Sequence, residues 1–140
     1  MIVSINPVKK TLPLLCVTCA ISFLFFPVDQ KNAKMKKMKM INKVSPMKQE
    51  LKKFIATGGA IEDAKRIMEA NGFTCVLNQR SDFVEMEESG DFLATHHDLD
   101  YLYCDKERGG LFCARRWQVA IVHKNGVVSD ILVSIGLTCL

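Results

Sequence analysis

The sequence lacks the motifs that most enzymes and metal sites require. Beyond its first 27 residues it contains no Cys-x-x-Cys or His-x-x-x-His spacing, which common zinc sites use. It has no glycine-rich phosphate-binding loop, because Gly109 and Gly110 are typical of a turn. Ser81, Ser89 and Ser129 do not lie in the context of a nucleophilic serine. These absences predict a non-catalytic protein with no cofactor and no metal.

Acidic residues are missing from residues 31–48, which contain seven lysines. Residues 49–140 contain ten Lys and Arg against fourteen Asp and Glu, so this part carries a formal charge of −4. Because a nucleic-acid-binding domain usually carries a basic footprint, we predict no nucleic-acid partner. The Lys- and Met-rich residues 31–43 favour a flexible, solvated tether, and the alternative is a segment that rests on an anionic membrane surface.

An apolar run of fifteen residues, 12–26, follows Lys9 and Lys10. As a helix it would span roughly 22 Å, because a helix rises about 1.5 Å per residue. This length is shorter than the ~30 Å hydrocarbon core of a bilayer. Positive charge followed by a short apolar run is typical of a signal peptide. The predicted organisation is a signal peptide or signal anchor at 1–27, a linker at 28–44 and one domain at 45–140.

Two features complicate the location of the domain. No small-x-small cleavage site follows the apolar run, and Cys16 and Cys19 lack the small preceding residue expected of a lipidation site. The lysines of residues 31–48 favour the cytoplasmic side for the chain that follows. We predict a periplasmic domain, free or tethered to the membrane, and the alternative is the cytoplasmic face of the inner membrane. Any membrane contact is predicted within residues 12–43.

Two helices are predicted at the start of the domain. Ser45 is an expected N-cap, and Pro46 suits the first helical position. The first helix is predicted to end at Gly58-Gly59, because glycine commonly terminates helices. The second is predicted over residues 60–71. Its inward stripe consists of Ile61, Ala64, Ile67 and Met68.

Alternating apolar residues predict four antiparallel strands, of which the first two are Phe73–Leu77 and Asp100–Cys104. The last two form a hairpin with a three-residue loop at Lys124-Asn125-Gly126, so paired residue numbers sum to 250 and Trp117 faces Val133. The core face of this hairpin comprises Trp117, Val119, Ile121, Ile131, Val133, Ile135 and Leu137. The opposite face, which can be wet, carries Gln118, Asp130 and Ser134.

Trp117 is predicted to lie in the core, and the alternative is a partner-binding anchor. The polar residues 78–99 are predicted to form a long loop, with a short extra strand at Phe83–Met86. The predicted fold is therefore α+β, with two N-terminal helices packed on a four-stranded antiparallel meander sheet.

A helix, then ATGGAIEDAKRIMEANGF, then an antiparallel sheet resembles the small cell-envelope proteins of the BamE and beta-lactamase-inhibitor-protein superfamily. The pattern covers residues 49–75, and the architecture alone extends over 76–140. The stretches DYLYCD and RRWQVAIVHKNGVVSDILVSIGLTCL also resemble uncharacterised bacterial envelope proteins. The resemblance implies a protein that binds other proteins as an adaptor, assembly factor or inhibitor, with no catalytic residues.

Four cysteines lie outside the N-terminal apolar run and permit three complete pairings. With paired numbers summing to 250, Cys113 lies opposite Leu137 and one diagonal step from Cys139. That step is about 7–8 Å, beyond the usual disulfide range of ~4.4–6.8 Å unless the strand ends fray. Shared inward faces favour the disulfides Cys75–Cys104 and Cys113–Cys139. The alternatives are a Cys104–Cys113 disulfide and four reduced cysteines in a cytosol-facing domain.

One stretch has metal-ligand chemistry, and its members are His96, His97, Asp98, Asp100 and Cys104. Adjacent histidines in an extended chain point to opposite sides, so only one of the pair joins a given site. We therefore predict a solvated loop, and the alternative is a metal-binding sensor or enzyme. The main prediction is an exported cell-envelope domain, with disulfide bonds, that binds another protein.

Overall fold

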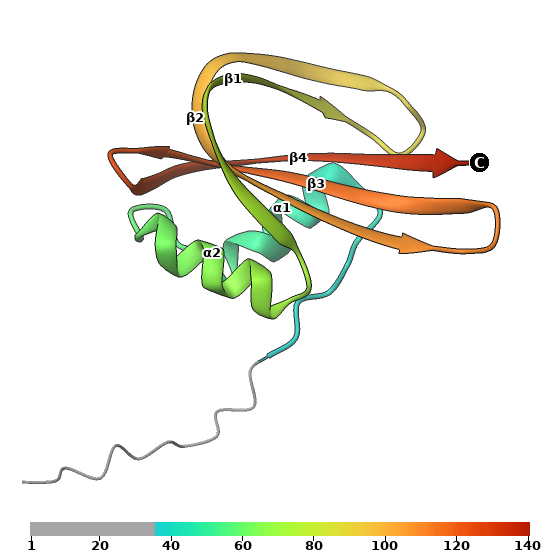
Figure 1. The fold of residues 1–140 in the computed structure, drawn as a ribbon, viewed down its shortest axis with the longest axis horizontal. Helices are drawn as coiled ribbons and strands as arrows, with labels where there is room; N and C mark the ends of the chain where they lie inside the picture. The colour runs from blue at the N-terminus through green and yellow to red at the C-terminus, as the bar shows by residue number, and fades with distance from the viewer. Residues whose placement is uncertain (1–35) are drawn as a thin grey trace, which may run out of the picture. The chain divides into compact units, whose positions relative to one another are not determined.

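The computed structural model describes residues 36–140, so the predicted signal segment, with Cys16 and Cys19, lies outside the described residues. Within them, two helices precede four strands, which pair as one antiparallel sheet in the order β1-β2-β3-β4 (Figure 1). The α+β fold with a meander sheet is therefore confirmed. Neither described helix is long and apolar enough to cross a membrane. The elements are α1 (Val44–Lys52), α2 (Ile61–Ala70), β1 (Thr74–Met86), β2 (Phe92–Gly109), β3 (Cys113–Lys124) and β4 (Val127–Cys139).

The first helix begins and ends earlier than its sequence predicts. Lys43, not Ser45, is the N-cap residue, and no side chain of the cap bonds to the helix. Instead, the Glu87 carboxylate accepts a hydrogen bond from the Val44 N–H at 3.2 Å, which satisfies one of the free N–H groups at the helix start. The helix ends at Lys52, well before the glycine pair. Gly58 donates its N–H to the carbonyl of Val128 in β4, so the glycines connect to the sheet instead of capping α1.

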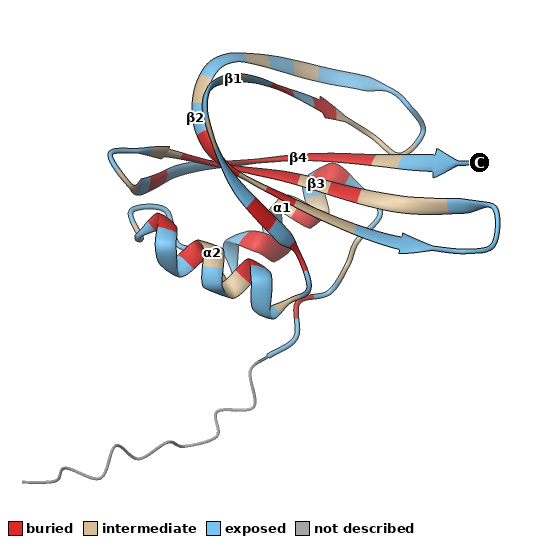
Figure 2. Ribbon diagram, viewed as in Figure 1, coloured by how far each residue is buried: buried red, intermediate tan, exposed pale blue. Residues whose placement is uncertain are grey.

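The main core lies between the two helices and the face of the sheet that carries Trp117 (Figure 2). Trp117 is 2% exposed, which confirms that it is a core residue. Leu137 was predicted on this core face but is 52% exposed, because it lies toward the end of β4 beyond the covered stretch. The fully buried large side chains of this core include Met47, Leu51, Met68, Leu102, Trp117, Val119, Ile121, Ile131, Val133 and Ile135.

The β3–β4 hairpin has a different register from the prediction. Trp117 faces Ile135, not Val133, so most paired numbers sum to 252. The turn contains two residues, Asn125 and Gly126, because Lys124 pairs with Val127. A register shift after this pair then adds one more residue to β4. Since the total slip beyond the shift is two residues, the β4 residues from Asp130 onward keep their predicted faces.

Residues 78–99 do not form the predicted loop. They extend β1 and β2 into a long hairpin, and the only turn within them covers residues 87–91. We call the distal part of this hairpin, residues 79–99, the arm. In Figure 1 the arm arches over β3 and β4 on the side away from the helices. The short strand predicted at Phe83–Met86 is therefore part of β1.

The arm covers the sheet face that was predicted to be wet. Phe83 packs in a second apolar cluster with Tyr101, Ala120, Val122 and Leu132. The Phe83 and Tyr101 rings meet edge to face, with centroids 5.8 Å apart. The face that carries Leu132 also carries Ser134, which is 6% exposed. Both faces of the central strands are thus buried.

The described end of the predicted linker packs on the domain. Met38 is 4% exposed, and its N–H donates to the Asn71 side chain at 3.0 Å. The Ile41 carbonyl accepts a hydrogen bond from the Trp117 indole N–H at 2.9 Å. The described residues before α1 are therefore part of the folded unit and not a solvated tether.

Candidate functional site

The candidate site lies along the edge of β4 that faces away from β3, beyond the first residues of the strand, which residues 58–60 cover. The N–H of Val133 donates away from β3, to the carboxylate of Glu85. Because backbone groups alternate in direction along an antiparallel strand, Ile135, Leu137 and Cys139 also present their N–H and C=O groups to this edge. The edge thus repeats the same hydrogen-bonding groups from Val133 to Cys139.

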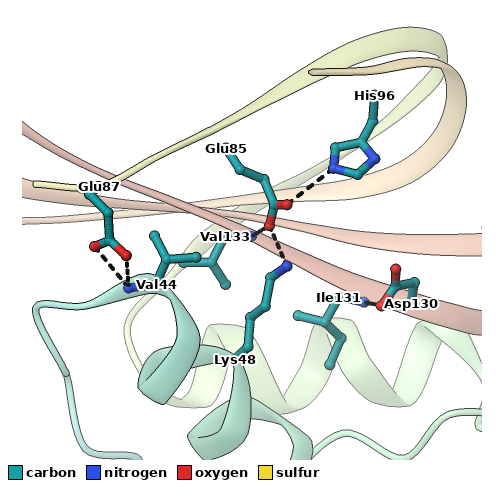
Figure 3. A network of polar contacts seen from close by, with 8 residues as sticks. All are labelled: Val44, Lys48, Glu85, Glu87, His96, Asp130, Ile131 and Val133. Atoms are coloured by element: carbon teal, nitrogen blue, oxygen red, sulfur yellow. Dashed lines mark hydrogen bonds and ion pairs between the residues drawn. The ribbon is translucent and has the colours of Figure 1, made fainter. Parts of the chain in front are cut away.

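Glu85 closes the inner half of the edge (Figure 3). Its carboxylate accepts the Val133 N–H at 3.1 Å and pairs with Lys48 Nζ of α1 at 2.5 Å. His96 Nε2 hydrogen-bonds to the second carboxylate oxygen at 3.1 Å. This one side chain therefore ties the arm, β4 and α1 together, so the arm runs beside the edge that it blocks.

The local chemistry keeps Glu85 ionised although the residue is 6% exposed. Burial acts to raise its pKa, but the hydrogen bonds from Lys48, Val133 and His96 together outweigh burial and hold the pKa below its ordinary value. The carboxylate thus has a full set of partners. It serves as a structural acceptor that joins three elements.

The outer half of the edge is open. Within residues 36–140 no strand pairs with Ile135–Cys139 on this side. A groove of about 620 Å³ reaches this stretch, with Leu137 on one side and the turn of the arm on the other. The residues that line the groove are Asn42, Lys43, Glu87, Glu88, Ser89 and Leu137.

An apolar loop lies at the same end of the sheet. Leu111 and Phe112 connect β2 to β3 and are 86% and 74% exposed. The Phe112 carbonyl accepts the Leu140 N–H at 3.1 Å, which holds the loop beside the end of β4. The Cys113–Cys139 disulfide fixes the same place covalently. Exposed apolar side chains next to an open strand edge are typical of protein-binding surfaces.

The cysteines pair as the sequence analysis favoured. Cys75 bonds to Cys104, and Cys113 bonds to Cys139, with Cα atoms 4.1 Å apart in each pair. Each pair sits directly opposite across two neighbouring strands. Two disulfides are typical of a protein in an oxidising environment such as the periplasm or the extracellular space.

The residues of the alternative metal site do not form one cluster. His96 points to Glu85, whereas His97 Nδ1 bonds to the Asp82 carboxylate at 2.8 Å. Asp98 pairs with Arg80, and Cys104 is in a disulfide. Across residues 36–140, no three His, Cys, Asp or Glu side chains are arranged to hold a metal ion.

Sequence reasoning missed Glu85 and the open edge. The available signal was the alternation of side chains along a strand, because Glu85 lies two residues after Phe83 and shares its inward face of β1. An acid at an inward position of a strand indicates a buried partner. The partners themselves come from α1 and β4, and no local pattern reveals that contact.

Comparisons with known proteins found no matching family model, no matching curated protein and no matching solved structure. The resemblance to the BamE and beta-lactamase-inhibitor-protein superfamily therefore stays a prediction.

Proposed function

We propose that this protein is an exported, non-catalytic domain of the cell envelope that binds an extended segment of another protein at the outer edge of β4. The observation that carries the proposal is the open stretch Ile135–Cys139, with its backbone groups directed outward. A partner strand there adds main-chain hydrogen bonds to the sheet, which is the mode known as β-augmentation. In this role the protein acts as an adaptor, assembly factor or inhibitor.

The chemistry of the edge defines the partner segment. Residues 131–140 contain no charged side chain and no proline, which are the features that usually prevent a strand edge from pairing with another chain. The edge can therefore pair with an uncharged strand. Leu137 is half exposed on this strand, and Phe112 lies exposed in the neighbouring loop. We therefore expect an uncharged, extended segment with apolar side chains at alternate positions.

The two disulfides support an exported location for the domain. We propose that it is periplasmic, or tethered to the membrane and facing the periplasm. The thiol state tests this part: protein isolated from the producing cells under acid quench should contain no free thiol at Cys75, Cys104, Cys113 or Cys139. Four alkylatable thiols at these positions would place the domain in a reducing compartment instead.

The binding surface is tested by photo-crosslinking in the producing cells. A photoreactive amino acid replaces Leu111, which is exposed and lies in the apolar loop. We expect a defined adduct with one other protein, identified by mass spectrometry. The same group at Lys124, at the opposite end of β3, should give no such adduct.

A second pair of substitutions tests whether binding uses the backbone N–H groups of the β4 edge. Leu137→Pro removes an N–H that faces the edge and is not used in pairing with β3, and proline is tolerated at such edge positions. Leu137→Ala keeps the N–H and serves as the matched control. The proposal requires the adduct to disappear in Leu137→Pro and to persist in Leu137→Ala. An adduct that survives Leu137→Pro, an adduct with a second copy of this chain, or no adduct at all contradicts it.

A further inference from the structure

A second surface carries strong positive charge, and it shares no residue with the groove beside β4. Lys36 and Lys37, from the segment before α1, are exposed. They line a hollow of about 450 Å³ together with Lys106 of β2 and residues 70–72 at the end of α2. Arg108, two positions further along β2, is also exposed. We call Lys36, Lys37, Lys106 and Arg108 the basic face.

Lys106 is the fixed member of the basic face. Its ammonium donates to the Asn71 carbonyl at 2.6 Å, at the C-terminal end of α2, where a positive charge is favourable. The same ammonium lies 5.5 Å from the centre of the Phe73 ring. The side chain is therefore held in one place at the wall of the hollow.

Lys106 lies close to other positive charges of the basic face. Burial lowers the pKa of this lysine most, and the positive charges of Lys37 and Arg108 lower it further. All three influences act in the same direction, with no carboxylate among them. Like charges held together raise the local concentration of anions, so this arrangement favours an anionic ligand.

We propose that the basic face binds anionic phospholipid headgroups and holds the domain against a membrane surface. The chain itself indicates this occupant. The apolar run 12–26 ends ten residues before Lys36, and ten residues extend over at most about 36 Å. A membrane that receives this run therefore lies within reach of the basic face, and tethering raises the effective concentration of the lipid surface.

Two further lysines precede the basic face in the sequence. In the sequence, Lys31 and Lys34 follow the apolar run and precede Lys36, and no acid occurs from residue 30 to residue 49. A polybasic segment beside a membrane-seeking run is attracted to anionic lipid. In this arrangement the basic face turns toward the bilayer, independently of the proposed strand binding at β4.

Lysine footprinting of the full chain tests the proposal. The protein is reconstituted in vesicles of phosphatidylcholine alone, or of phosphatidylcholine and phosphatidylglycerol in equal parts. It is then labelled with a water-soluble amine reagent and analysed by mass spectrometry. We expect Lys36 and Lys37 to be protected about threefold or more in the anionic vesicles, with loss of protection at 1 M salt. Lys52 and Lys124, both exposed, are the internal controls.

Both vesicle types can bind the apolar run, so a variant of the basic face is needed to distinguish lipid binding by this face from anchoring by the run. Arg108→Gln changes an exposed residue and should reduce the protection of Lys36 and Lys37, whereas Lys124→Gln should leave it unchanged. Equal labelling of Lys36 and Lys37 in both vesicle types overturns the proposal. Protection by inorganic phosphate alone, with no dependence on vesicles, also overturns it, because the hollow would then be a site for a small soluble anion.

Discussion

Replacing Glu85 tests the closure of the β4 edge most directly. Glu85→Ala removes the acceptor of the Val133 N–H and the partners of Lys48 and His96. Hydrogen bonds to a charged group contribute about 1.5–3 kcal/mol, and a buried N–H left without an acceptor costs about 1–3 kcal/mol. Lys48, whose side chain is 27% exposed, regains water and offsets part of the loss. We expect the free energy of unfolding to fall by about 3 kcal/mol in total.

Glu85→Gln separates the charge from the hydrogen bond. The amide oxygen still accepts the Val133 N–H, but it no longer pairs with the ammonium of Lys48, so we expect a loss of only about 1 kcal/mol. Glu107→Gln is the matched control, because Glu107 is an exposed carboxylate on β2. Its change should stay within about 0.5 kcal/mol. Urea unfolding at pH 7, followed by tryptophan fluorescence, measures all three values.

The pH dependence gives an independent check. The pKa of Glu85 is lowered in the folded state, so the unfolded chain binds the proton more readily. The stability that Glu85 contributes is therefore fully present above the unfolded pKa of about 4.3. It is lost as the pH falls from there through the folded pKa. The difference between wild type and Glu85→Gln should shrink below about pH 4.3. Equal stability of Glu85→Ala and Glu107→Gln, or a difference that does not change with pH, would refute the role given to Glu85.

Three further predictions follow from the packing. Mild reductant should open Cys113–Cys139 before Cys75–Cys104, because its cysteines are exposed whereas Cys104 is fully buried, and alkylation with peptide mapping measures the order. Trp117→Phe should cost about 1–2 kcal/mol and speed tryptic cleavage before α1, because the Ile41 carbonyl loses its donor; unchanged cleavage would contradict this. Glu87→Ala should lower the free energy of unfolding by about 1 kcal/mol, because Val44 loses its side-chain acceptor at the start of α1.

The sequence predicted the faces of the strands better than their register. Side-chain direction follows from a period of two, so the apolar pattern placed Trp117 on the core side. The register depends instead on the turn and on any bulge, and in β3–β4 these shift the pairing by two residues. That slip places Cys113 directly opposite Cys139 and removes the diagonal gap that the predicted register required.

Apart from the short strand at Phe83–Met86, the arm was not predicted from its own residues. Residues 78–99 are mostly polar and exposed, so they lack the alternation that identifies a half-buried strand. They are strands because the backbone of β1 pairs with that of β2, with three register shifts on the way. The packing of Phe83 and Glu85 against β4 depends on how the arm curves, which is a property of the whole sheet.

The two outer edges of the sheet differ in a way that supports a binding role for β4. The edge of β1 is interrupted by register shifts after Asn78, after Ser81 and after Glu85, and Arg80 has a positive φ of 46°. Such irregularities protect a strand edge from pairing with another chain. The pairing of β4 with β3 has no shift from Asp130 to Cys139. Because Glu85 covers only the Val133 end of that regular stretch, the outer half keeps the geometry that an incoming strand requires.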